Sequence, residues 1–76
     1  MKYLESRADI AHGELIIKGT RIRIAQVMRM LVGGMTLEQI HNEWWPWITS
    51  KKIRGAVEEA INFFEKTNND KKILQT

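Results

Sequence analysis

The single proline of this chain, Pro46, constrains its fold more than any other residue. It lies in an aromatic corner, Trp44-Trp45-Pro46-Trp47-Ile48, within the segment from Gly34 to Phe64. Proline has no amide hydrogen and pushes the preceding residue out of the helical region, so one continuous helix is forbidden here. We therefore expect two helices joined by a tight corner, which is a helix-turn-helix unit. Such a unit suggests nucleic-acid binding, but many small helical proteins contain one for packing alone.

Both helices of this unit have full start signals. The first is expected at residues 36–44, because Thr36 can cap it and Gln39, three residues later, completes a capping box. The second is expected at residues 49–66, with Thr49 as its cap. An apolar pair flanks each start as a hydrophobic staple, namely Met35 with Ile40 and Ile48 with Ile53.

Apolar side chains recur along both helices at helical spacing, so each is expected to bury one face. On the first helix these residues are Leu37, Ile40 and Trp44. On the second they are Ile53, Ala56, Val57, Ala60, Ile61 and Phe64. Phe63 lies off this stripe and is expected to face a partner subunit.

A β-hairpin at residues 15–24 and a further helix at 24–33 are expected before this unit. The runs 15–17 and 22–24 are rich in isoleucine and flank a turn, Lys18-Gly19-Thr20. An isolated hairpin is marginal in water, so its apolar face must rest on the helices or pair with another chain. The helix is indicated by an apolar stripe and a Gly33-Gly34 stop; the stripe is Ile24, Val27, Met28, Leu31 and Val32.

The two ends of the chain give weaker patterns. Residues 1–13 are mixed and are compatible with an arm or a short edge strand. From Thr67 the sequence turns polar, so residues 67–76 are expected to form a flexible tail. Within it, Ile73 and Leu74 form a short apolar segment that could become ordered on binding a partner protein. We therefore expect a single, mainly α domain at residues 1–66.

Size and composition limit what this domain can be. A chain of 76 residues buries only about 60% of its unfolded surface. It contains no cysteine, so neither a disulfide nor a thiolate zinc site can support it. Tight helical packing, a partner chain or both are the expected remedies, and we expect a homodimer. The net charge of +3 permits nucleic-acid contact without demanding it. No apolar run is long enough for a membrane span or a signal peptide, so we expect a cytoplasmic protein.

Two runs carry a family resemblance: IIKGTRIRIAQVMRMLVGGMTLEQI and PWITSKKIRGAVEEAI. They resemble the small bacterial and archaeal proteins of domain-of-unknown-function family 433, over roughly Ile10 to Phe64. The matching residues are Ile17, Gly19, Thr20, Arg21, Ile22, Gly34, Met35, Thr36, Glu38, Ile40, Pro46, Ile48 and Thr49.

This resemblance implies a three-helix, homeodomain-like fold with a short β element in front. It also implies a role like that of VapB-type antitoxins, which neutralise a toxin, often a PIN-like ribonuclease, and bind their own operator DNA. The chain departs from the family pattern at Leu15 and Arg23, where proline is common, and its corner is one residue longer and richer in tryptophan. After Thr49 the family more often shows acidic residues, whereas this chain has Ser50-Lys51-Lys52.

The start of the last helix is the strongest candidate for a nucleic-acid site. Lys51, Lys52 and Arg54 lie in its first turn, where cations oppose the helix dipole at a cost of roughly 0.3–1 kcal/mol each. A helix N-terminus flanked by cations suits a phosphate, and the second helix of a helix-turn-helix meets DNA at this end. We therefore assign DNA contacts to residues 49–54, from Thr49 and Ser50 through the three cations. The alternative is a basic turn that is merely solvated, and Glu58 and Glu59 limit how far the helix could follow a phosphate backbone.

The hairpin carries a second set of cations. Lys18 and Arg23 are expected to contact phosphate, since Arg23 alternates outward. For Arg21 we expect a structural ion pair with Glu38 or Glu43.

The tryptophans could stack on bases, as aromatic platforms do for single strands. At a helix corner they more often enter a core or an interface, because each buries a large apolar area. We expect Trp44 in the core and place Trp45 and Trp47, with Phe63, Ile73 and Leu74, in a partner or dimer interface.

His12 and His41 are isolated, and no spacing indicates a metal site, a cofactor or a catalytic pair. An enzyme is therefore not expected. The expected function is an antitoxin-like, DNA-binding autoregulator that occludes a PIN-like toxin. The alternative is a protein–protein adaptor without nucleic-acid binding.

Overall fold

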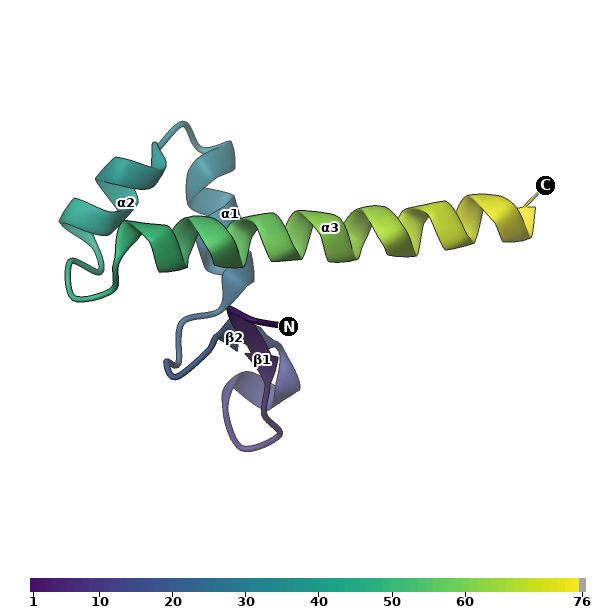
Figure 1. The fold of residues 1–76 in the computed structure, drawn as a ribbon, viewed down its shortest axis with the longest axis horizontal. Helices are drawn as coiled ribbons and strands as arrows, with labels where there is room; N and C mark the ends of the chain where they lie inside the picture. The colour runs from purple at the N-terminus through teal and green to yellow at the C-terminus, as the bar shows by residue number, and fades with distance from the viewer. Residues whose placement is uncertain (76) are drawn as a thin grey trace.

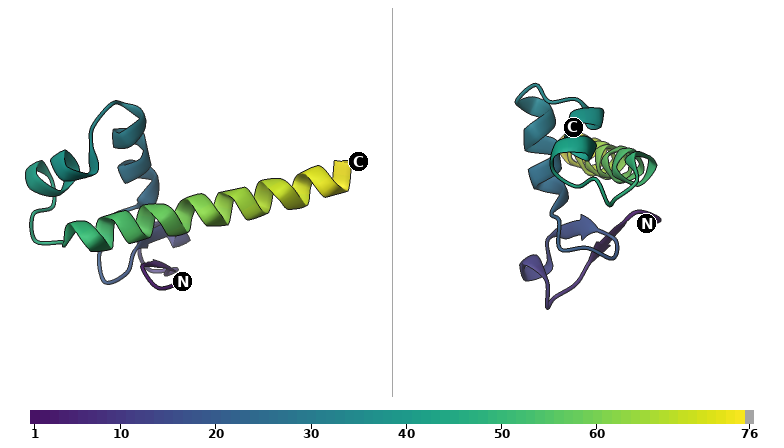
Figure 2. Two further views of the ribbon diagram at one scale, coloured as in Figure 1. Left: turned by 45° about the horizontal axis from the view of Figure 1, so that its top comes forward. Right: turned by 90° about the vertical axis from the view of Figure 1, so that its left-hand side faces the viewer.

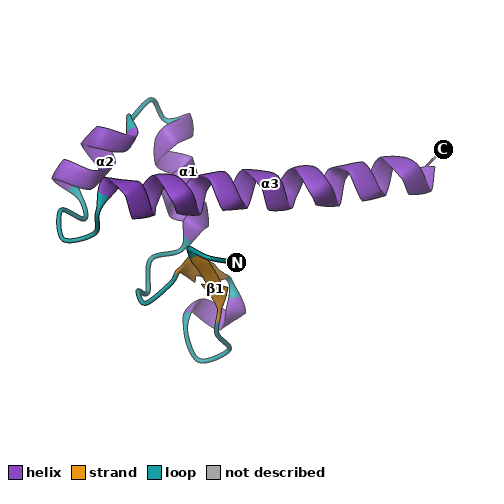
Figure 3. Cartoon of the chain, in the orientation of Figure 1, coloured by secondary structure: helices purple, strands orange, loops and turns teal. Residues whose placement is uncertain are grey.

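The computed structural model describes the backbone of residues 1–75 and the side chains of residues 1–66. Three helices follow a small two-stranded sheet, and the longest helix, α3, runs across the whole molecule (Figures 1 and 3). The elements are β1 (Leu4–Ser6), a 3-10 turn η1 (Ala11–Gly13), β2 (Leu15–Ile17), α1 (Ile24–Val32), α2 (Leu37–Glu43) and α3 (Ser50–Gln75). The expectation of a mainly helical domain with three helices and a short N-terminal hairpin is confirmed.

The sheet pairs β2 with a different strand from the one expected. β1 and β2 are antiparallel, with Leu4 opposite Ile17. The run 22–24 is not a strand: it contributes a single bridge between Ile16 and Arg23. The reason is that α1 begins at Ile24, so the chain leaves the sheet before a ladder can form. The second strand of the sheet is instead β1, from the N-terminal segment that the sequence left open as an arm or an edge strand.

The turn between β2 and α1 is held by side chains. The Thr20 hydroxyl donates to the carbonyl of Ile17 at 2.7 Å and accepts from the amide of Ile22 at 3.0 Å. Gly19 has a φ of 81°, a conformation that favours glycine, and its amide donates to Glu5 Oε2 at 2.8 Å. This turn therefore ties β1, β2 and the start of α1 together.

The two predicted threonine caps are confirmed. The Thr36 hydroxyl accepts from the Gln39 amide at 3.1 Å, and the Gln39 side chain accepts from the Thr36 amide at 2.9 Å. The Thr49 hydroxyl accepts from the Lys52 amide at 3.1 Å. These bonds satisfy amide groups that a helix leaves unpaired at its start.

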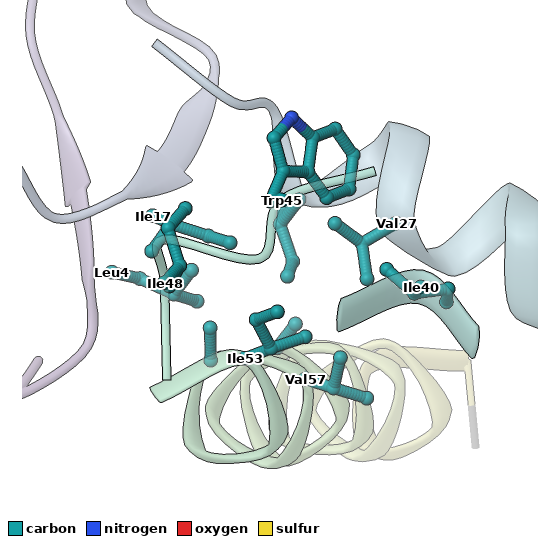
Figure 4. Close-up of a cluster of buried hydrophobic side chains, with 11 residues drawn as sticks. Leu4, Ile17, Val27, Ile40, Trp45, Ile48, Ile53 and Val57 are labelled. Carbon is teal, nitrogen blue, oxygen red and sulfur yellow. The ribbon is translucent and has the colours of Figure 1, made fainter. Parts of the chain in front are cut away.

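The core lies between α1, α2, the corner and the first three turns of α3, and the sheet closes one side (Figure 4). From α3 it receives Ile53, Ala56, Val57 and Ala60, all buried as expected. From the rest of the chain it receives Leu4, Ile17, Ile24, Val27, Ile40, Trp45 and Ile48. On α1 the expected stripe is too long, because Val32 at the end of the helix is 89% exposed.

The tryptophans of the corner are arranged differently from the prediction. Trp45 is 9% exposed and belongs to the core, whereas Trp44 is 49% exposed. The assignments of Trp44 to the core and of Trp45 to an interface are therefore wrong. α2 ends at Glu43, and the Trp45 amide donates back to the carbonyl of Ile40 at 3.3 Å. The chain thus turns before Pro46, and this turn, not the helical period, carries Trp45 inward.

α3 is longer than expected and projects beyond the core (Figures 1 and 2). Ala60 is the last buried residue of its described side chains, and Ile61 and Phe64, which the stripe predicted as buried, are each 43% exposed. We call residues 61–75 of α3 the overhang. Ile73 and Leu74 lie outside the residues whose side chains are described. No helix in the described part of the chain is both long and apolar enough to cross a bilayer.

The N-terminal segment is attached to α3 at two points. The Tyr3 amide donates to Glu59 Oε2 at 2.6 Å. The Tyr3 ring covers Gly55 so closely that a Cβ atom there would lie 2.4 Å from the ring. Glycine inside a helix costs about 1 kcal/mol relative to alanine, and here its small size admits the aromatic ring.

Candidate nucleic-acid interface

The basic turn, residues 50–54, faces a groove between α2 and α3. The groove has a volume of about 590 Å³ and is lined by Leu37, Glu38, His41, Asn42, Ser50, Lys51 and Arg54. Figure 1 shows why it forms there: the corner returns the chain so that the start of α3 lies beside α2. Lys51 and Arg54 are exposed and three residues apart, so they occupy neighbouring positions on one helix face.

Lys52 belongs to a different part of the surface. Its side chain is partly buried, and its ammonium nitrogen lies 3.8 Å from the position that a Cβ atom on Gly19 would occupy. It therefore leans over the turn between β2 and α1. Lys18, from the same turn, donates to the carbonyl of Met1 at 3.1 Å. The structure thus divides the predicted cations between the α2–α3 groove and this turn.

Arg23 and Arg21, which precede α1, differ in their contacts. Arg23 is exposed, but its guanidinium forms an ion pair with Glu14 at 3.4 Å. This pair offsets part of the charge that Arg23 would present to a phosphate. Arg21 is also exposed, and neither of the two ion pairs recorded among the described side chains includes it. The expected ion pair of Arg21 with Glu38 or Glu43 is therefore wrong.

α2 contributes residues to the groove that the sequence did not single out. Glu38, His41 and Asn42 have spacings of three and four and line the wall opposite Lys51 and Arg54. The signal was available, because these positions lie on the face of α2 away from Ile40. Asn42 and His41 add hydrogen-bonding groups, whereas the Glu38 carboxylate adds a negative charge that opposes an anionic ligand.

The electrostatic arrangement at the start of α3 favours an anion over a cation. The first turn contains no acidic residue, and the positive end of the helix dipole lies at this end of α3. The nearest acidic residue beyond this turn on α3, Glu58, is exposed one turn after Arg54. The anion-binding surface is therefore short: it spans the first turn of α3 and the adjacent wall of α2.

The residues predicted to face a partner are dispersed. Trp47 is 74% exposed at the corner, and Phe63 is 46% exposed on the overhang. Trp47 lies in the corner before α3 begins at Ser50, whereas Phe63 lies on α3 beyond the buried Ala60. They do not form a single surface.

The comparisons with known proteins identify a family but no activity. A family model described as a protein of unknown function, DUF433, matches residues 5–60. No curated protein and no solved structure matches. The match begins in β1 and ends at Ala60, the last buried residue among the described side chains of α3, so it stops where the overhang begins. This chain therefore belongs to the DUF433 family.

Proposed function

We propose that this protein binds duplex DNA through the start of α3 and acts as an antitoxin-like autoregulator. The observation that carries the DNA-binding part is the pair of exposed cations, Lys51 and Arg54, facing an open groove beside α2. A cationic helix start of this kind suits phosphate, and in a helix-turn-helix the same end of the second helix contacts base edges.

The residues of the groove fall into two groups, one for phosphate contacts and one for base contacts. Lys51 and Arg54 neutralise backbone phosphates, which contributes affinity but no sequence information. Asn42 and Ser50 lie in the same groove and carry the hydrogen-bonding groups that read base edges or fix register. Thr49 acts indirectly: its hydroxyl caps α3 and so holds the first turn, with Lys51 and Arg54, in position.

The partner in the antitoxin role is a toxin, for which a PIN-like ribonuclease is the candidate. This part of the proposal derives from the resemblance of the family to VapB-type antitoxins. Operator binding and occlusion of the toxin then operate together, and a homodimer places two α3 helix starts on successive half-sites about one DNA turn, roughly 34 Å, apart.

The DNA-binding proposal is tested with a double charge reversal, Lys51→Glu with Arg54→Glu. Binding is measured by fluorescence anisotropy on a duplex from the region upstream of the gene, at several salt concentrations. We expect affinity to fall on the order of tenfold or more, and the slope of log K against log salt to decrease by roughly 2, because two phosphate contacts are lost.

The matched control is Lys2→Glu with Arg29→Glu, which makes the same change in net charge at exposed cations outside the groove. The control is expected to bind nearly as well as the unmodified protein. Equal losses for both double variants would reduce the effect to net charge and refute the site. An unmodified protein that binds no DNA even at low salt would refute DNA binding altogether.

A protein adaptor is the second candidate, and the exposure of Trp47 favours it. A tryptophan that is 74% exposed beside a helix corner is typical of a contact with another protein. Capture of a co-expressed partner protein that Trp47→Ser abolishes, together with no DNA binding by the unmodified protein even at low salt, would favour the adaptor.

A further inference from the structure

Two tryptophans of the corner stay on the surface when the core forms. Trp44 is 49% exposed and Trp47 is 74% exposed, so each leaves a large apolar ring in contact with water. The Trp44 ring lies against that of the buried Trp45, with 6.0 Å between the ring centroids. Trp47 has the more open ring of the two and is therefore the stronger candidate for a contact with another molecule.

A tight turn fixes the position of Trp47. The turn runs from Trp45 to Ile48 and is closed by the Ile48 amide, which donates to the Trp45 carbonyl at 3.0 Å. Pro46 takes the second position, where its restricted φ suits such turns, and Trp47 takes the third. Trp45 and Ile48 are 9% and 5% exposed and belong to the core, so the turn is anchored at both ends. A side chain held in this way is preorganised and loses little conformational freedom when it binds.

The charges near the corner indicate the kind of partner. Residues 44–57 contain three cations and no acidic residue, and two of the cations, Lys51 and Arg54, are exposed. The exposed phenylalanines of the overhang have the opposite surroundings, because residues 58–66 contain three acidic residues and one lysine. Glu43 precedes the corner and is the acidic residue nearest to it in sequence. The corner thus combines an exposed aromatic face with cations, and this combination matches a partner that carries both flat rings and negative charge.

We propose that the corner binds the unpaired bases of a single-stranded nucleic acid, with Trp47 stacking on a base. In a duplex the bases are stacked on one another, so an indole face meets a base face where the strand is unpaired. Every base has such a face, and neighbouring cations neutralise the phosphates of the same strand. The Cα atoms of Trp47 and Lys51 are four residues apart in sequence and so at most about 14 Å apart, a distance that a few nucleotides span.

Trp44 provides a second, weaker contact for a neighbouring base. It is three residues from Trp47, so their Cα atoms are at most about 11 Å apart. Its ring is less exposed because Trp45 lies against it. The contribution to affinity should therefore follow the exposure of the two rings, with Trp47 first and Trp44 second.

This inference goes beyond the proposed binding of duplex DNA and can fail separately from it. Lys51 and Arg54 contact phosphate in both ligands, whereas Trp47 contacts only the single strand. Charge reversal at the two cations should weaken both ligands, and a change at Trp47 should weaken the single strand alone. Because the two ligands share the cations, each should displace the other.

The first experiment separates the bases from the phosphates. Fluorescence anisotropy measures binding to a thymidine strand of about 12 nucleotides, to an abasic strand of the same length, and to the upstream duplex. The thymidine strand should bind on the order of tenfold more tightly than the abasic strand, because stacking adds to the same phosphate contacts. Equal affinity for the two strands, or binding of the duplex alone, overturns the proposal. Binding of the thymidine strand without the duplex would support it and refute the proposed duplex site.

The second experiment tests the aromatic face of Trp47. Trp47→Leu keeps an apolar side chain but removes the ring, so it should lose the preference for thymidine over the abasic strand. Its affinity for the duplex, which depends on phosphate contacts, should stay within about twofold. Trp47→Phe keeps an aromatic face and should retain most of the preference. Phe64→Leu makes the matched change at an exposed ring of the overhang and should retain all of it. A Trp47→Leu protein that keeps the preference, or a Phe64→Leu protein that loses as much, contradicts the assignment.

Tryptophan emission of the unmodified protein gives a readout that needs no variant. Stacking on a base quenches an indole, so the thymidine strand should lower the emission and the abasic strand should not. The buried Trp45 should keep its emission in both cases. Unchanged emission with the thymidine strand bound would refute stacking. Capture of a partner protein through Trp47, together with no binding of the thymidine strand, would assign the corner to a protein contact instead.

Discussion

The two halves of α3 have similar apolar spacing but different surroundings. From Ser50 to Ala60, one side of the helix is covered by α1, α2, the corner and β1, and Ile53, Ala56 and Ala60 have no exposed surface. Beyond Ala60, the apolar side chains of Ile61, Phe63 and Phe64 are almost half exposed. The spacing of apolar residues therefore shows which face of a helix is destined for burial, but not which molecule buries it.

This contrast also separates stability from function. The first half both closes the core and presents Lys51 and Arg54 on its opposite side, so the candidate DNA site is built on a rigid element. Among its described side chains the second half contributes none to the buried core, and it extends past the residues that match the family model. Substitutions in the first half should change the folding of the monomer, whereas substitutions in the second should change association.

The largest expected effect compares an isoleucine from each half. Ile53→Ala removes a side chain with no exposed surface and should lower the free energy of unfolding by about 2–5 kcal/mol. Ile61→Ala should change it by less than about 1 kcal/mol in dilute monomer, since Ile61 is largely at the surface. Urea denaturation followed by circular dichroism at low micromolar concentration measures both. Comparable losses at the two positions would abolish the distinction between the halves.

Gly55 gives a smaller effect and tests how tightly the first half is packed. Gly55→Ala would place a methyl group against the Tyr3 ring, so we expect a loss of about 1–3 kcal/mol from overpacking, reduced by up to about 1 kcal/mol of helix propensity. Thermal denaturation should show a lower midpoint. In a Tyr3→Ala background the same change should become neutral or stabilising, because only the propensity gain remains. Stabilisation with Tyr3 in place would contradict the close contact.

The smallest expected effect is at the cap that begins the first half. Thr49→Ala removes the hydroxyl that accepts the Lys52 amide and should cost about 1 kcal/mol. Thr49→Ser retains the hydroxyl and should cost a few tenths at most. The free energy of unfolding from urea titration distinguishes them. A Thr49→Ser loss as large as that of Thr49→Ala would show that the threonine methyl, not the hydrogen bond, stabilises the helix start.

The start of each helix after Gly34 could be predicted from sequence because caps depend on neighbours within a few residues. Thr36 and Gln39 bond across three positions, and so do Thr49 and Lys52. The basic turn could be found for the same reason, since its cations are adjacent in sequence. The opposite wall of the groove was harder to predict. Whether Glu38 and Asn42 face the basic turn depends on the angle at which the corner places α3 against α2.

The errors arise where a local pattern competes with a long-range contact. Trp44 continued the helical period of α2, but the chain turned one residue earlier and buried Trp45. The run 22–24 had the composition of a strand, but the start of α1 at Ile24 removed it from the sheet, and β1 paired with β2 instead. In the second case the competing contact joins β1 to β2 across an intervening loop, whereas Trp45 is turned inward by a local turn in which its amide bonds back to Ile40 and is then buried by the rest of the core.

The sequence by itself determined the number of helices, the two capped starts after Gly34 and the helix break before Pro46, because these depend on backbone geometry within a few residues. It also determined the family, because that is carried by the order of residues along the chain. Only the tertiary structure decided which tryptophan enters the core, which strand pairs with β2 and where the burial of α3 ends. The physical reason is that burial requires both an apolar helix face and other segments that pack against it. In this chain the segments that pack against α3 bury its described side chains as far as Ala60 and no further.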